Sequence, residues 1–202
     1  MYRRHCLFLL LLVYARVPAQ VSDPEWPCVQ VLIPEIVSAV VWPEVIDESL
    51  VGAWEEDESL AAMAEKLSDL DEFTDSERQL IAVFAESVTQ DSRSDTLNML
   101  ADGIVTLSNR RRTRYITGIK RYTRQQISIA EQIETTLNQL VELEAQASSE
   151  SVVRQAEIEE TLHWHQRVYD QREHAIQSLC ERPVELEEKL SIVLRELAQY
   201  LP

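Results

Sequence analysis

Apolar residues recur every three or four positions from residue 94 to residue 181, and the polar segment "SSES" at 148–151 divides the run. This spacing is typical of helices with one apolar face, and no proline occurs between Pro43 and Pro183. The pattern predicts two long helices that pack antiparallel across a tight corner, a coiled-coil-like helical hairpin over residues 94–181. If the corner centres on Ser148, residue i faces about residue 296 − i.

Two shorter periodic segments precede the hairpin and one follows it. Apolar spacing predicts a helix over Ser59–Leu70, and Thr74 followed by Glu77 has the form of a capping box that starts a second helix. We expect Pro183 to end the returning helix, because proline lacks a backbone donor and clashes with the preceding turn. A separate C-terminal helix is then predicted for 184–200. The predicted fold class is all-α: a long antiparallel helical hairpin with two shorter helices and an extended N-terminal arm.

Residues 20–43 differ in character from the helical domain that follows at 44–202. Four prolines divide this segment into short apolar runs, which excludes a regular helix and favours extended backbone. We expect an extended arm that lies over the helices, with Trp26 and Trp42 as its anchors. A flexible tail is the alternative, and Cys28 argues against it.

The first 19 residues have the pattern of a cleaved signal peptide. A basic start precedes a short apolar run, and Val17 and Ala19 supply the small residues of a cleavage site. The apolar run reaches about half of the roughly 20 residues that span a bilayer, so an uncleaved anchor is disfavoured. We expect a secreted protein that is located in the periplasm.

The chain is strongly acidic, with a formal net charge of −16. Loss of residues 1–19 removes three of the 19 basic residues, which leaves 16 basic against 35 acidic residues and a net charge of −19. Such a chain repels nucleic acid and anionic membrane surfaces. We therefore expect no nucleic-acid partner, and contact with a membrane surface is disfavoured.

Two cysteines, Cys28 and Cys180, remain once the leader is removed with Cys6. Two cysteines in an oxidising compartment favour one disulfide, here between the arm and the returning helix. A pair of free buried thiols is the alternative. A zinc site is disfavoured because neither cysteine has another ligand at the usual spacing.

The first long helix carries a dense basic cluster. Its members are Arg110, Arg111, Arg112, Arg114, Lys120, Arg121 and Arg124. One interpretation is a docking surface for an acidic partner protein, a second copy of the chain, or a phosphate or lipid headgroup. The alternative is internal, because the register places Arg110–Arg114 near Glu181, Glu185, Glu187 and Glu188, where interhelical ion pairs can form. The charges outnumber these four carboxylates, so an external role stays open.

Three histidines on the returning helix, His163, His165 and His174, are weak candidates for metal ligands. Glu160 and His163 have the Glu-x-x-His spacing of di-iron bundles, but those bundles need the motif twice. At 100° per residue, His163 and His174 fall opposite the apolar stripe and His165 falls within it. We expect a solvated face and a buried histidine, with no metal and no cofactor.

The sequence contains neither a G-x-S-x-G motif nor a glycine-rich phosphate loop. No cysteine is left for nucleophilic catalysis if the disulfide forms. We therefore expect that the protein is not an enzyme.

Several short motifs resemble a family of uncharacterised secreted α-helical proteins of proteobacteria. They are "WPCVQ", a following "VW", "GIKRYTRQQ" and "C-x-x-P-V-x-L-E", and they are scattered between Trp26 and about Leu190. The family is similar in placing one cysteine in the arm and one before the proline, which suits a disulfide. The resemblance implies no activity and no catalytic or binding residues.

These observations predict a non-catalytic periplasmic scaffold or accessory protein. It would act through protein–protein contacts of the helical hairpin or the arm, with another protein or a second copy of itself. The alternative is a periplasmic metal-binding or stress-sensing helical bundle that uses His163, His165 and His174. Peripheral membrane binding through residues 110–124 is a third hypothesis, and the net charge opposes it.

Overall fold

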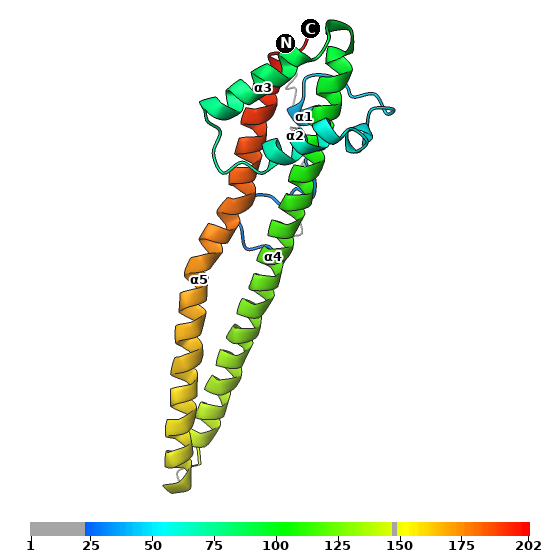
Figure 1. The fold of residues 1–202 in the computed structure, drawn as a ribbon. Helices are drawn as coiled ribbons and strands as arrows, with labels where there is room; N and C mark the ends of the chain where they lie inside the picture. The colour runs from blue at the N-terminus through cyan, green and yellow to red at the C-terminus, as the bar shows by residue number, and fades with distance from the viewer. Residues whose placement is uncertain (1–22, 147–148) are drawn as a thin grey trace, which may run out of the picture.

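Two long helices dominate the computed structural model, which describes residues 23–146 and 149–202 (Figure 1). Helix α4 spans Arg93–Glu144 and helix α5 spans Ser149–Ala198, and the two run side by side in opposite directions. The predicted all-α class and the long antiparallel hairpin are confirmed. The predicted signal peptide and the centre of the corner at Ser148 lie outside the described residues.

The register of the hairpin follows hydrogen bonds between the two helices. Tyr122 Oη donates to the backbone carbonyl of Arg172 at 2.9 Å, and Gln126 Nε2 donates to the carbonyl of Tyr169 at 3.1 Å. The residue numbers of these pairs add to 294 and 295. A corner centred on Ser148 predicts that the numbers of facing residues add to about 296, so the observed register agrees with the predicted one.

Short helices form a head at the end of the hairpin that holds the start of α4 and the end of α5 (Figure 1). They are α1 (Ser38–Val41), η1 (Ala53–Glu55), α2 (Glu58–Ser68), α3 (Asp75–Ser87) and η2 (Gln90–Ser92). The capping box of Thr74 and Glu77 begins α3, as predicted, and the Asp57 carboxylate caps α2 by accepting from two backbone N–H groups. The predicted helix over residues 59–70 corresponds to α2.

The apolar core of the described residues lies in the head. It combines Trp42 and Trp54 with side chains of α2, α3, the first turns of α4 and the last turns of α5. Ile81, Leu97, Leu100, Ile104 and Leu194 are among its fully buried members. Burial of each large apolar side chain stabilises the fold by about 1.5–3 kcal/mol, so this end of the hairpin is the best stabilised.

Pro183 does not end the returning helix, contrary to the prediction. Helix α5 continues through it, and the predicted separate helix at 184–200 is the last part of α5. Pro183 is buried, and Leu186 and Leu190 in the next turns are buried as well. Tertiary packing therefore overrides the local preference of proline. Figure 1 shows that the orange-to-red part of α5 is inclined to its yellow part, as expected for a helix that contains proline.

The segment before α1 is an extended arm that lies over the helices, as predicted, and it runs along the hairpin in the direction opposite to α4. Helix α1 itself lies inside residues 20–43, where a regular helix was not expected, because its four residues fit between Pro34 and Pro43. Asp23 pairs with Lys120, Ile36 with Asn109 and Trp42 with Asn98, so rising numbers in the arm meet falling numbers in α4. The arm thus follows the hairpin from its middle to the head. The described residues of the arm do not cover the other half of the hairpin.

Candidate partner-binding surfaces

A disulfide fixes the arm to the returning helix. Cys28 and Cys180 are bonded, with 5.5 Å between their Cα atoms and 152 residues between them in sequence. The predicted disulfide is therefore confirmed, and neither thiol is available for catalysis or metal binding. Such a long closed loop is worth up to about 5 kcal/mol in the chain-entropy account of disulfides.

The two tryptophans of the arm are placed differently. Trp42 is buried in the head, and its indole Nε1 donates to Asn98 Oδ1 at 2.6 Å. Asn98 in turn donates from Nδ2 to the Glu44 carboxylate at 3.0 Å, so this buried polar group is satisfied on both sides. Trp26 is only half-buried, and its Nε1 donates to the carbonyl of Gln30 within the arm. Trp42 is thus the stronger anchor.

Five of the seven residues in the basic cluster form ion pairs inside the molecule. The pairs are Arg110–Glu55 at 2.9 Å, Arg111–Asp69 at 2.5 Å, Arg112–Glu187 at 2.7 Å, Lys120–Asp23 at 2.7 Å and Arg124–Glu25 at 2.6 Å. Arg112 is also 3% exposed and donates to the carbonyl of Ile33 in the arm. The cluster therefore attaches the arm, η1 and α2 to α4.

The partners of these ion pairs differ from those that the hairpin register suggested. Of the four expected carboxylates of α5, only Glu187 pairs with the cluster in the described part of the chain. The other partners come from segments whose position on α4 the sequence pattern did not reveal. Within residues 23–146 and 149–202, Arg114 and Arg121 have no ion-pair partner, and both are exposed.

The ion pair between Asp23 and Lys120 is sensitive to acid. The hydrogen bond from Lys120, with a smaller contribution from the backbone N–H of Glu25, lowers the pKa of the Asp23 carboxyl below its ordinary value. A carboxyl whose pKa is lower in the folded state stabilises the fold above its unfolded pKa. That contribution is lost as the pH falls through the folded pKa, so acid weakens this attachment of the arm.

The three histidines do not come together. His163 and His174 are exposed and lie three turns apart on α5, whereas His165 is half-buried with its ring 5.2 Å from that of Trp164. Among the described residues no group of three His, Cys, Asp or Glu side chains could hold a metal ion. His174 Nδ1 is 2.7 Å from the carbonyl of Asp170, one turn earlier.

A polar layer that the sequence analysis did not identify crosses the middle of the hairpin. The Arg172 guanidinium donates to Gln126 Oε1 at 3.0 Å and to Gln125 Oε1 at 2.9 Å. Its Cζ also lies 4.0 Å from the centroid of the Tyr122 ring, a cation–π contact. Arg172 stands seven residues after His165 and seven before Leu179, which are both half-buried, so heptad spacing could have indicated its inward direction.

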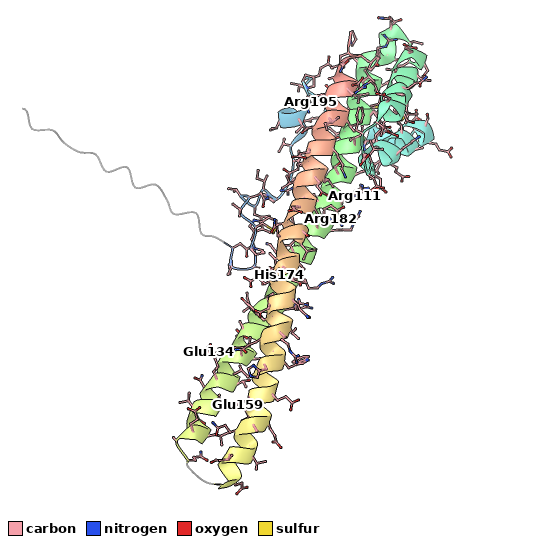
Figure 2. All side chains as sticks on the ribbon, turned by 90° about the vertical axis from the view of Figure 1, so that its left-hand side faces the viewer. Arg111, Glu134, Glu159, His174, Arg182 and Arg195 are labelled. Carbon is pink, nitrogen blue, oxygen red and sulfur yellow. A yellow bond between two sulfur atoms is a disulfide. The ribbon has the colours of Figure 1, made fainter. Side chains whose placement is uncertain are left out.

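Beyond this layer lies the distal hairpin, which we define as residues 127–146 and 149–170. Its large exposed apolar side chains are Ile127, Leu137, Val141, Val152, Val153 and Trp164. Only Leu143 and Leu162 are buried apolar side chains in its described part. None of its carboxylates forms an ion pair among the described residues. No other element covers this apolar and acidic surface in the described structure (Figure 2).

Comparisons with protein-family models, with curated proteins and with solved structures found no match to this chain. The resemblance to a family of uncharacterised secreted helical proteins therefore stays a prediction. In the part of the chain that the structure describes, no helix is long and apolar enough to cross a membrane.

Proposed function

We propose that this protein is a non-catalytic periplasmic scaffold or accessory protein that engages another protein through the distal hairpin. The observation that carries the proposal is the exposed apolar surface of that region. Val141 is 64% exposed and Val152 is 63% exposed, although both lie on well-formed helices. Exposed apolar side chains gathered on one element, with nothing packed on them, are typical of an interaction site.

The basic cluster contributes little to this proposed contact. Five of its seven members neutralise carboxylates of the same chain, and this occupies the end of the hairpin near the head. Exposed ion pairs are worth about 0–1 kcal/mol each. Exchanging an internal ion pair for one with a partner protein therefore gains little binding free energy. We therefore place the partner contact on the distal hairpin rather than on the seven basic residues.

The disulfide supports the proposed location. Disulfides persist in oxidising compartments such as the periplasm and are rare in the reducing cytosol, and Cys28 is bonded to Cys180 here. The cleavable leader predicted for residues 1–19 would deliver the chain there.

Site-specific photo-crosslinking in the native host tests the proposal. A photoreactive amino acid at Val141 or Val152 is expected to give one discrete adduct with another protein. The matched control is Val83 on α3, an exposed valine of the head with 59% exposure, where we expect no adduct. No adduct at either distal position, or the same adduct at Val83, would contradict the proposal.

A further inference from the structure

The hairpin has two lateral sides, and the contacts of the arm distinguish them. Residues of a coiled-coil seam repeat every seven positions, and in α4 and α5 the buried side chains of Gln126 and Leu162 mark that seam. Relative to these seam residues (position a), Lys120 stands at position b of α4 and Cys180 at position e of α5. Both contact the arm. The e and b positions of both helices therefore form one side, which we call the arm face.

Apolar side chains occur on the arm face beyond Lys120, which contacts Asp23, the first described residue of the arm. Ile127 and Val141 occupy b positions of α4, Leu137 occupies an e position of α4, and Val152 occupies an e position of α5. All four are exposed. The arm face is thus apolar in the distal hairpin, and no described residue of the arm covers it there.

The charge of the arm face is of one sign. Beyond the polar layer at Arg172, its e and b positions carry exposed carboxylates and neither Lys nor Arg. The carboxylates are Glu134, Glu144, Glu159 and Asp170. The opposite side is mixed in charge: the g positions of α4 in this region are glutamine (Gln125, Gln132 and Gln139), Arg154 stands at a g position of α5, and exposed carboxylates occupy c positions. Figure 2 shows Glu134 on the same side of the hairpin as the arm, and Arg111 on the other side.

We propose that the distal arm face binds a cationic amphipathic helix of another protein, which extends the two-helix hairpin into a three-helix bundle. The inference rests on the proposed function and specifies the face and the chemistry of the partner. An apolar stripe between unpaired carboxylates fits a helix with apolar residues at i, i+3, i+4 and i+7 and Lys or Arg beside them. A second copy would bring the same carboxylates to the same face, and like charges would oppose such a dimer.

The length of the stripe sets the size of the partner helix. Ile127 and Val141 are 14 positions apart on α4, about 21 Å at 1.5 Å per residue. A docked helix of four to five turns covers this distance. Such an interface falls at the low end of specific contact areas, below about 1,200 Å², and such contacts are typically transient.

A titration with a synthetic peptide tests the inference on the full-length oxidised protein. The probe is a fluorescein-labelled helix of about 18 residues with Leu at i, i+3, i+4 and i+7 and Lys elsewhere. Fluorescence anisotropy is expected to give micromolar affinity that weakens with salt. A scrambled peptide of the same composition lacks the apolar stripe and is expected to bind at least about tenfold more weakly.

Two charge-reversal variants with the same net charge distinguish binding at the arm face from attraction of the peptide to the overall negative charge of the protein. Glu134→Lys/Glu159→Lys changes the arm face, whereas Glu150→Lys/Glu157→Lys changes exposed carboxylates at c positions of α5, away from that face. We expect the first variant to weaken binding about tenfold or more and the second about twofold or less. Val141→Ser/Val152→Ser is expected to weaken binding as well, without changing the helical circular dichroism.

Equal losses in the two charge variants, or equal binding of the scrambled peptide, would overturn the inference. A wild-type dimer in sedimentation analysis that Val141→Ser/Val152→Ser converts to a monomer would also overturn it, because the occupant would then be a second copy. Failure of the peptide test together with a distal cross-linked adduct would leave the proposed function standing. If photo-crosslinking at Val141 and Val152 gave no adduct, the proposed function itself would be contradicted.

Discussion

At the scale of single residues, Gly103 sets how closely the head packs on the hairpin. A Cβ atom at this position would lie 2.8 Å from Cδ2 of Trp54 and 3.0 Å from the Cβ of Ala64. Both neighbours are buried in the core, so neither can move without disturbing other side chains. Glycine within a helix costs about 1 kcal/mol relative to alanine, and here that cost permits the close approach of η1 and α2 to α4.

We predict that Gly103→Ala lowers the free energy of unfolding by about 1–3 kcal/mol, because overpacking outweighs the gain in helix propensity. Gly118 in the same helix is the matched control, since a Cβ there meets nothing within 4 Å. Gly118→Ala is expected to raise the free energy of unfolding by up to about 1 kcal/mol. Urea denaturation followed by circular dichroism measures both, and a stabilised Gly103→Ala variant would contradict this account of the packing.

The sequence predicted residue roles where local chemistry determines them and missed those that depend on distant segments. The capping box at Thr74 and Glu77 is local, so four residues sufficed to identify it. Asn109 holds the arm by donating to the carbonyl of Ile36 at 2.8 Å and accepting from its N–H at 2.9 Å. Nothing local marks Asn109 for this role, because its partner lies 73 residues earlier.

At the scale of secondary structure, Pro183 is a residue whose tertiary contacts outweigh its local preference to break a helix. Proline cannot donate a hydrogen bond to the carbonyl of Leu179, four residues earlier, and this normally costs about 3 kcal/mol in a helix interior. Cys180 on one side is fixed by the disulfide, and Leu186 on the other side is buried against the rest of the fold. These contacts hold both flanking turns in one helix.

We predict that Pro183→Ala stabilises the protein by about 1–2 kcal/mol. Restoring the backbone donor gains about 3 kcal/mol, and losing the buried ring atoms costs about 1–2 kcal/mol. Differential scanning calorimetry of the oxidised protein measures the change, and Pro183→Gly serves as a control that restores the donor without helix propensity. A lower Tm for the alanine variant would show that the bend at Pro183 is required for packing of the head.

Helix positions and the hairpin register were predictable because apolar periodicity extends over many turns, which averages out local exceptions. The break expected at Pro183 was wrong because a single residue's preference cannot report what its neighbours pack against. The distal stripe was also open to prediction. Ile127 and Val141 each follow a seam position by one residue. Their side chains therefore do not pack against the other helix of a two-helix hairpin.

At the scale of the whole molecule, stability is distributed unevenly along the hairpin. The head end combines several layers of helix around one core, whereas the distal hairpin is a pair of helices with polar side chains in its seam. Thr136 and Ser151 are buried there at positions where a stable coiled coil carries leucine or isoleucine. The described residues of the arm and the disulfide stabilise the half of the hairpin nearer the head. A partner helix would therefore add most stability where the chain has least of its own.

We predict that hydrogen exchange follows this gradient. Amides of residues 127–143 and 155–170 are expected to exchange fast, through local opening. Amides of residues 97–108 and 190–197 are expected to exchange more slowly, through global unfolding, because the core holds these segments. Mass spectrometry of the oxidised protein measures both regions in one sample. Saturation with the cationic peptide should slow exchange of the distal amides and leave the head unchanged, because ligand binding stabilises the state that binds it. Uniform protection along α4 and α5 would mean that the polar seam is no weaker than the core, which would contradict the stability gradient.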